Sequence, residues 1–168
     1  MITLHTAGWL VVRLTVAYVY LYALYLNAHD KAARTWLLEH TAYLFPNTEE
    51  PLRSKLAKWS AVAGMMMMFV GSISILLGLK GRIGGLLLLL FTAGGIYQHR
   101  REREVAMAVA SKVAPLVPDS ARADFSTLQW SAFAGHVSSG LKNWALCGIS
   151  FAFFALGTGP YSLDNWIR

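Results

Sequence analysis

Residues 59–99 read WSAVAGMMMMFVGSISILLGLKGRIGGLLLLLFTAGGIYQH, and this stretch decides the fold class. Two apolar blocks, 59–79 and 81–99, are joined by the tight linker 78–82, which contains Lys80 and Arg82. An α-helix rises about 1.5 Å per residue, so each block is about long enough to cross the roughly 30 Å hydrocarbon layer of a bilayer. The stretch therefore predicts two antiparallel transmembrane helices joined by a tight turn.

Two further apolar blocks, 8–28 and 137–156, flank this pair. Across the 168 residues, 55% are hydrophobic and 14% are charged, whereas a soluble domain carries about 25% charged residues. The blocks are expected to be helices, because an open sheet would leave backbone groups unpaired in lipid. The sequence predicts an all-α integral membrane protein whose single domain, residues 1–168, is a four-helix bundle.

The segment between the third and fourth spans has its own pattern. Arginines and glutamates fill residues 100–104, and valines at helical spacing follow until the prolines at 115 and 118. This pattern is typical of a short amphipathic helix that lies in the membrane interface. Four spans place both termini on one side and the long loops 27–58 and 98–136 on the other. Those loops hold most of the basic residues and most of the acids, so the membrane orientation stays open.

The formal net charge of +6 comes mainly from short basic segments beside the apolar blocks. This placement suits contact with lipid headgroups, so we expect membrane lipids and no nucleic acid as partners. The lone cysteine, Cys147, excludes an internal disulfide. The sequence contains no P-loop, dinucleotide fingerprint or Ser/His/Asp set, and hence no self-sufficient active site of those kinds.

Two helices carry side chains that suit a ligand pocket. Tyr18, Tyr22 and Tyr25 recur at intervals of four and three residues on one face of the first span. In the fourth span, Lys142 and Asn143 offer hydrogen-bond donors within the bundle. Together they predict a pocket for a flat, apolar ligand with polar ends, which describes a quinone. The alternatives are that the tyrosines pack against other side chains and that the lysine reaches the headgroups.

Three histidines lie at the same predicted level of the bundle. His29, His99 and His136 lie at the ends of spans one, three and four on the side of the long loops, with His40 in the adjacent loop. Three imidazoles could ligate copper or zinc, and two of them could hold a haem. The spacing carries no metal motif of its own, so the sequence favours interfacial histidines without a metal or haem.

A charge lies inside the first span. Arg13 is a few residues below the membrane boundary, on the side where the fourth helix ends. Asp164 is the nearest acid on that side, and it follows the flexible turn 157–160. We therefore expect Arg13 and Asp164 to pair. The alternative is that the arginine reaches a lipid phosphate.

The end of the chain resembles a known family. Leu141-Lys142-Asn143-Trp144-Ala145-Leu146, an apolar run, and then Gly157-Thr158-Gly159-Pro160-Tyr161-Ser162-Leu163-Asp164 are similar to the close of DoxX-family membrane proteins. The resemblance extends to Arg13 in the first span, to Leu-Gly-Leu and a basic turn between spans two and three, and to His99. It covers all four spans. The long loops and the tyrosine-rich first helix depart from the family pattern.

The resemblance implies a four-span protein of a bacterial or archaeal cytoplasmic membrane. The family takes its name from the small membrane subunit of a thiosulfate:quinone oxidoreductase. A DoxX-like chain is therefore expected to anchor or assist a quinone-linked oxidoreductase, with quinone between its helices and other membrane subunits of a redox complex as partners. It would act as part of that complex and not as an enzyme alone. The alternative is a non-catalytic accessory subunit that stabilises a larger membrane complex and binds only lipid.

Overall fold

The computed structural model describes residues 4–159 and 161–167, and within these ranges it confirms the predicted all-α class. The α-helices are α1 (Leu4–His29), α2 (Lys31–Thr41), α3 (Leu52–Leu77), α4 (Gly81–Val113), α5 (Arg122–Leu156) and α6 (Leu163–Trp166). Short 3-10 turns follow at η1 (Ala42–Leu44), η2 (Ala114–Leu116) and η3 (Asp119–Ala121).

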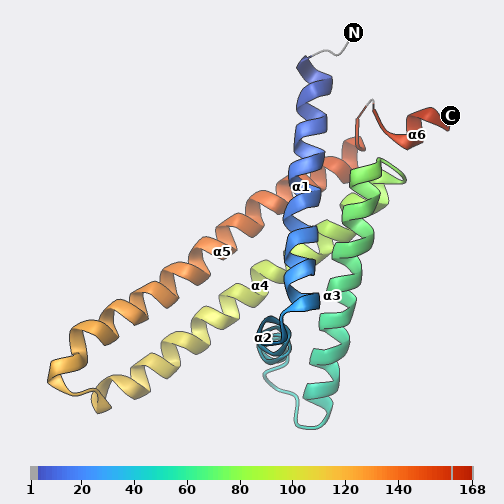
Figure 1. Ribbon diagram of the computed structural model, residues 1–168. Coiled ribbons are helices and arrows are strands. Elements are labelled where there is room, and N and C mark those ends of the chain that lie inside the picture. Colours follow the sequence, from blue (N-terminus) through green and yellow to red (C-terminus); the bar gives the residue numbers. More distant parts are fainter. Residues whose placement is uncertain (1–3, 160, 168) are drawn as a thin grey trace.

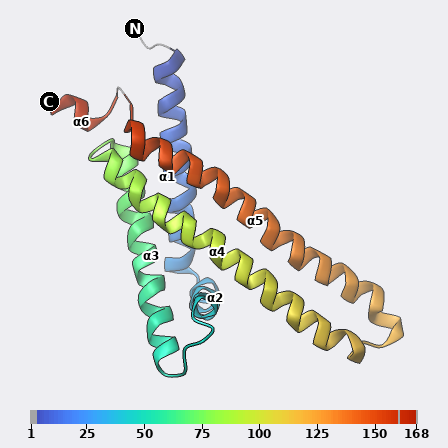
Figure 2. The same cartoon turned by 180° about the vertical axis from the view of Figure 1, so that it is seen from behind.

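The helices form two pairs that diverge from one end. Helices α1 and α3 pack together, while α4 and α5 form a long antiparallel hairpin whose outer half runs away from them (Figures 1 and 2). The start of α1, the α3–α4 turn and α6 share one end of the molecule, called the turn end below (Figure 1). The buried core lies where α1, α3, α4 and α5 meet and contains Val16, Tyr20, Met68, Ile75, Leu88 and Phe153.

Helix α2 lies in the angle between these two pairs (Figure 1). Asp30 alone separates α1 from α2, and its Oδ1 atom accepts a hydrogen bond from the backbone N–H of Ala32 at 2.8 Å. A side-chain oxygen at this position caps a helix, so α2 begins directly after α1 ends. The bend places α2 across the space between α1, α3 and α4.

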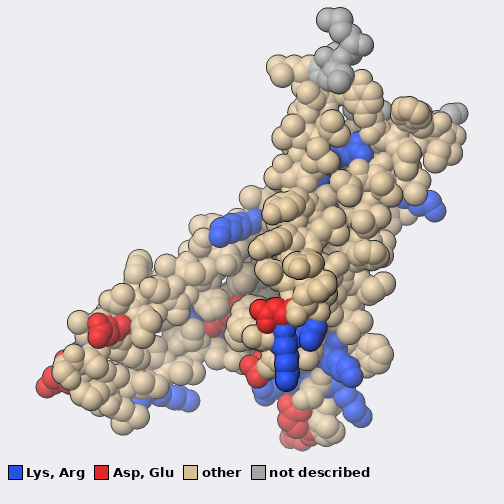
Figure 3. All heavy atoms as spheres, viewed as in Figure 1, with Lys and Arg blue, Asp and Glu red and all other residues tan. Residues whose placement is uncertain are grey.

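Two of the described helices are long and apolar enough to cross a membrane, Thr6–His29 and Leu52–Leu77. They contain the predicted first span and most of the predicted second span. The predicted third and fourth spans lie in α4 and α5, which run through more polar and charged positions. Figure 3 shows charged side chains gathered around α2 and the start of α3, whereas few are visible along α1.

The predicted short interfacial helix is not a separate element. Residues 100–113 continue α4 without a break, because no proline or glycine interrupts them. Side-chain pairs within one turn support this continuation, with Arg100 and Arg101 at 3.3 and 2.6 Å from Glu104. The helix ends at Val113, two residues before Pro115. The amphipathic segment is therefore the outer half of α4, packed along α5.

Adjacent glycines allow α4 to approach two helices at one level. A Cβ atom on Gly84 would lie 2.7 Å from the Cβ of Ser74 and 2.9 Å from the carbonyl oxygen of Gly71, both on α3. A Cβ atom on Gly85 would lie 2.4 Å from the backbone nitrogen of Phe154 on α5. Such close backbone approach through small residues is the way helices pack in lipid. This contact fixes α3, α4 and α5 near the turn end.

Candidate functional site

A cavity of about 510 Å³ lies between α1, α2, α3, α4 and α5. Its lining is mostly apolar and includes Met65, Met67 and Met68, which belong to a run of four methionines at residues 65–68 of α3. Trp36 and Leu37 of α2 line it from the side where the helix pairs diverge. Methionine side chains adapt to irregular ligands, and mostly apolar walls with a few polar groups are typical of small-molecule sites.

Asn143 is a polar side chain of this cavity that is open to a ligand. Asn27 and Gln98 also line the cavity, but each side-chain amide donates to an atom of its own helix, at 2.8 and 2.9 Å. The Asn143 amide packs against Gly95, where a Cβ atom would lie 2.8 Å from Nδ2. Among the described residues, the Asn143 side chain has no hydrogen-bond partner. The Asn143 amide can therefore donate to a bound molecule, as can the hydroxyl of Ser60, which lines the same cavity and also has no partner among the described residues.

The two predicted donors of the fourth span have different surroundings. Asn143 lines the cavity, whereas Lys142 lines a shallow groove on the outer surface of α5 with Trp130 and Leu141. Consecutive residues of a helix point about 100° apart, so they seldom face the same space. The structure thus places Asn143 in a pocket and leaves Lys142 outside it.

The predicted tyrosine stripe faces outward. Tyr18, Tyr22 and Tyr25 are all more than half exposed, and none of them lines the cavity. Tyr20, which the sequence analysis missed, is 3% exposed, lines the cavity and shares a 2.6 Å hydrogen bond with the hydroxyl of Thr92 on α4. The expectation that the stripe forms the pocket wall is wrong for these side chains, because helical spacing shows which residues share a face and not which face points inward.

A signal for the inward face was present in the sequence. Arg13, Val16, Ala17 and Tyr20 follow one another at helical spacing, and all four are buried. A charged residue within an apolar span usually faces the bundle interior. Arg13 therefore marks the inner face of α1, and Tyr20 lies on it.

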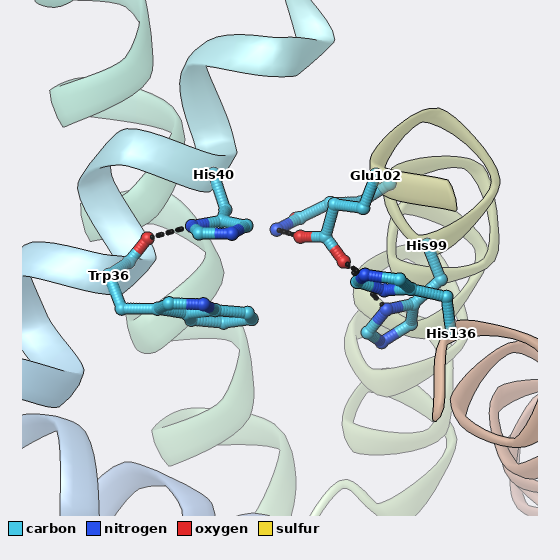
Figure 4. A network of polar contacts seen from close by, with 6 residues as sticks. Trp36, His40, His99, Glu102 and His136 are labelled. Carbon is cyan, nitrogen blue, oxygen red and sulfur yellow. Dashed lines mark hydrogen bonds and ion pairs between the residues drawn. The ribbon is translucent and has the colours of Figure 1, made fainter. Parts of the chain in front are cut away.

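A buried carboxylate lies one turn beyond the cavity-lining residues Gln98 and His99 of α4. Glu102 on α4 is 2% exposed, and its Oε2 atom lies 2.9 Å from Nδ1 of His99 and 3.2 Å from Nδ1 of His136 on α5 (Figure 4). Its Oε1 atom accepts a hydrogen bond from Gln98 at 2.9 Å. Burial raises the pKa of the Glu102 carboxyl, but hydrogen bonds from His99 and Gln98 outweigh this effect and hold the pKa below its usual value.

The structure brings together two of the three histidines predicted as metal ligands. His99 and His136 meet at Glu102, and the three ligand atoms lie within 4.8 Å of one another. His29 is outside this group: it is exposed and stacks on Tyr25 at 4.2 Å between ring centroids. The expectation that His29 joins them is wrong, because α1 ends apart from the α4–α5 contact.

His40 lies on α2 and not in a loop. Its ring stacks on Trp36 at 4.1 Å between centroids, and its Nδ1 atom lies 2.8 Å from the Trp36 carbonyl oxygen. Figure 4 shows the imidazole pointing from α2 toward Glu102, opposite His99 and His136.

Glu102 was not predicted as a site residue, because it lies within a run of charged residues that indicates a solvent-exposed segment. Its spacing of three residues after His99 was the available signal.

Arg13 occupies the turn end of the bundle. It is 3% exposed, and its Nε and Nη2 atoms donate to the carbonyl oxygens of Ile75 and Leu76 at 3.1 and 2.8 Å. Its Nη1 atom donates to the carbonyl oxygen of Tyr161. The last carbonyls of a helix have no partner within the helix, so the end of α3 is a natural acceptor for a guanidinium.

Asp164 binds the N-terminal end of a helix, whereas Arg13 binds a C-terminal end. Its Oδ1 and Oδ2 atoms accept hydrogen bonds from the backbone N–H groups of Lys80 and Gly81, at 2.8 and 3.2 Å. These donors begin α4, where amides are unpaired and the helix dipole is positive. Arg13 and Asp164 do not pair directly within the described residues, so that prediction is wrong. The last carbonyl groups of α3 bind the arginine, and the first amide groups of α4 bind the aspartate.

The fold and the site define an all-α protein with membrane-compatible helices around an apolar cavity, beside a buried carboxylate. The chain matches no protein-family model, no curated protein and no solved structure. The DoxX resemblance stays a prediction, and Pro160 of its C-terminal motif lies outside the described residues.

Proposed function

We propose that this protein is a multi-pass membrane subunit that binds quinone or quinol in the cavity enclosed by helices α1 to α5 and anchors or assists a quinone-linked oxidoreductase. The observation that carries the proposal is the apolar cavity of about 510 Å³ with the unpartnered amide of Asn143 on its wall. Sites for small apolar ligands have volumes of roughly 300–1,000 Å³ and few polar groups. The DoxX resemblance supports a bacterial or archaeal cytoplasmic membrane as its location.

The proposal includes four membrane spans, with the inner halves of α4 and α5 beside α1 and α3. Large apolar side chains are exposed on all four helices, among them Leu14, Phe69, Leu90 and Phe151. Apolar surface of this extent is unfavourable in water and favourable against lipid tails. The close glycine contacts between α3, α4 and α5 support the same arrangement.

The residues of this chain bind and orient the ligand in this proposal. The Nδ2 atom of Asn143 donates to a quinone carbonyl oxygen, and the ring lies against the methionine side chains of α3. Tyr20 stays bonded to Thr92 and forms part of the wall. Electrons are exchanged with partner subunits, so the chain supplies a place for the quinone and not the whole reaction.

Thermal unfolding with short-chain ubiquinone and menaquinone analogues tests the proposal. A ligand at about 100 times its Kd stabilises a protein by about 2.7 kcal/mol. Asn143→Leu keeps the side-chain size but removes the donor, and we expect Kd to rise about tenfold, which corresponds to about 1.4 kcal/mol. Lys142→Met is the matched control, since this neighbour lies outside the cavity, and the full stabilisation should remain.

The results separate the two functions named for this chain. An accessory subunit that holds only lipid would show no change of Tm with any quinone, and this result would overturn the proposal. Equal stabilisation of the wild type and of Asn143→Leu would show that the head group binds elsewhere.

A further inference from the structure

Glu102, His99 and His136 bring three metal-ligating atoms together on two packed helices. His99 and Glu102 lie one turn apart on α4, and His136 faces them from α5 (Figure 4). All three atoms lie within 4.8 Å of one another, and both Nδ1 atoms are directed at the same oxygen, Oε2 of Glu102. Ligand atoms around a four-coordinate zinc ion lie about 3.4 Å apart. Two of the three separations, 2.9 and 3.2 Å, are already close to this value.

The donor set has a specific chemical preference. Two imidazoles and one carboxylate are the ligands of open zinc sites and of non-haem iron sites. We propose that His99, Glu102 and His136 bind a divalent first-row transition-metal ion. The ion would balance the buried negative charge of Glu102 while both imidazoles stay neutral. The proposal stands on this cluster and does not depend on quinone binding.

The surroundings of the cluster support a metal site. Gln98 donates to Oε1 of Glu102, which holds the carboxylate with Oε2 toward the histidines. Outer partners of this kind orient metal ligands in known sites. A groove of about 360 Å³, lined by His40, Glu102 and His136, leads to the cluster and leaves room for a water or a further ligand.

The level of the cluster also fits access from water. Glu102 lies 21 residues after Gly81, the first residue of α4. At about 1.5 Å per residue this is about 32 Å along the helix, close to the roughly 30 Å thickness of the hydrocarbon layer. Because α4 is inclined to α1 and α3 (Figure 1), it crosses less depth than this length, and the cluster lies beside the charged residues 100–104, where a hydrated ion can reach it.

Metal titration of the purified, full-length protein in detergent tests the proposal. After treatment with a chelator, we expect calorimetry to show one Zn²⁺ bound per chain and Co²⁺ to give the visible absorption of a bound ion. Glu102→Gln and His136→Ala should weaken Zn²⁺ binding by more than about 100-fold, beyond the effect of losing an outer partner. Gln98→Leu should weaken it by about tenfold.

His29→Ala is the matched control, because it removes an exposed histidine outside the cluster. This variant should bind one Zn²⁺ with unchanged affinity. The opposing explanation is a purely structural contact in which Glu102 joins α4 to α5. It predicts no stoichiometric metal binding by the wild type, and that result alone would overturn the proposal, even if a cluster variant fails to fold. Equal affinity of the wild type and folded Glu102→Gln would overturn it as well.

Discussion

Replacing Arg13 with methionine tests whether this arginine holds the turn end of the bundle together. Methionine keeps an unbranched side chain but provides no donor. The substitution leaves the carbonyl oxygens of Ile75, Leu76 and Tyr161 without the guanidinium that now bonds them. Two of these carbonyls belong to the last turn of α3: that of Ile75 keeps a hydrogen bond from the backbone N–H of Gly78 at 3.1 Å, whereas that of Leu76 has no other partner among the described residues.

The expected loss follows from the burial of these groups. A buried polar group left without a partner costs about 1–3 kcal/mol, and among the described residues the carbonyls of Leu76 and Tyr161 lose the donor that bonds them, while that of Ile75 keeps Gly78. Part of this loss is offset, because the variant no longer has to desolvate a guanidinium that is only 3% exposed. We expect Arg13→Met to lower the free energy of unfolding by about 3 kcal/mol. For a chain of this size, Tm should fall by about 6–12 °C.

Thermal unfolding in detergent micelles, followed by circular dichroism, measures this change. Arg82→Met is the control, because Arg82 is an exposed arginine at the same end of the molecule. Its effect should stay within about 0.5 kcal/mol of the wild type. If Arg13→Met unfolds at the same temperature as Arg82→Met, the three carbonyl contacts do not stabilise the protein, and the reasoning is refuted.

Gly85→Ala should destabilise the bundle by about 1–3 kcal/mol in the same assay, because its Cβ would meet the α5 backbone at 2.4 Å. Gly148→Ala is open within 4 Å and should be neutral or stabilising, so equal losses would contradict the packing argument. Tyr20→Phe removes the hydrogen bond to Thr92 and should cost about 1 kcal/mol, whereas Tyr22→Phe on the exposed face should cost nothing measurable. A Tyr22→Phe loss as large as that of Tyr20→Phe would show that the faces of α1 are assigned wrongly.

Apolar block length predicted helices in the right places, but it could not predict where the long helices end. The blocks 81–99 and 137–156 mark only the inner halves of α4 and α5, which run from Gly81 to Val113 and from Arg122 to Leu156. Hydropathy falls after residue 99, yet the helix continues because side-chain pairs and the α5 surface support it. Polarity indicates where a helix leaves lipid and not where it stops.

Only part of the candidate site could be predicted from the sequence, because the packing and rotation of the helices decide which side chains meet. His99 and His136 had to converge once their helices formed an antiparallel hairpin, and the structure brings them within reach of one oxygen. The burial of Glu102 depends on α2 and α5 covering it, which no local pattern reveals. Asn143 was predicted together with Lys142, and only the rotation of α5 decides which of the two lines the cavity.

The divergence of the two helix pairs divides α4 into regions of unequal mechanical support. Near Gly81 the helix is held by α3 and α5, whereas beyond Glu102 it is packed mainly along α5. Fraying of such a two-helix arm starts at its free tip and travels inward, since each lost turn removes the support of the next. The contact of Glu102 with His136 ties α4 to α5 where the arm leaves the bundle. The Glu102–His136 contact therefore holds α4 against α5 at the base of the arm, between its tip and the cavity wall.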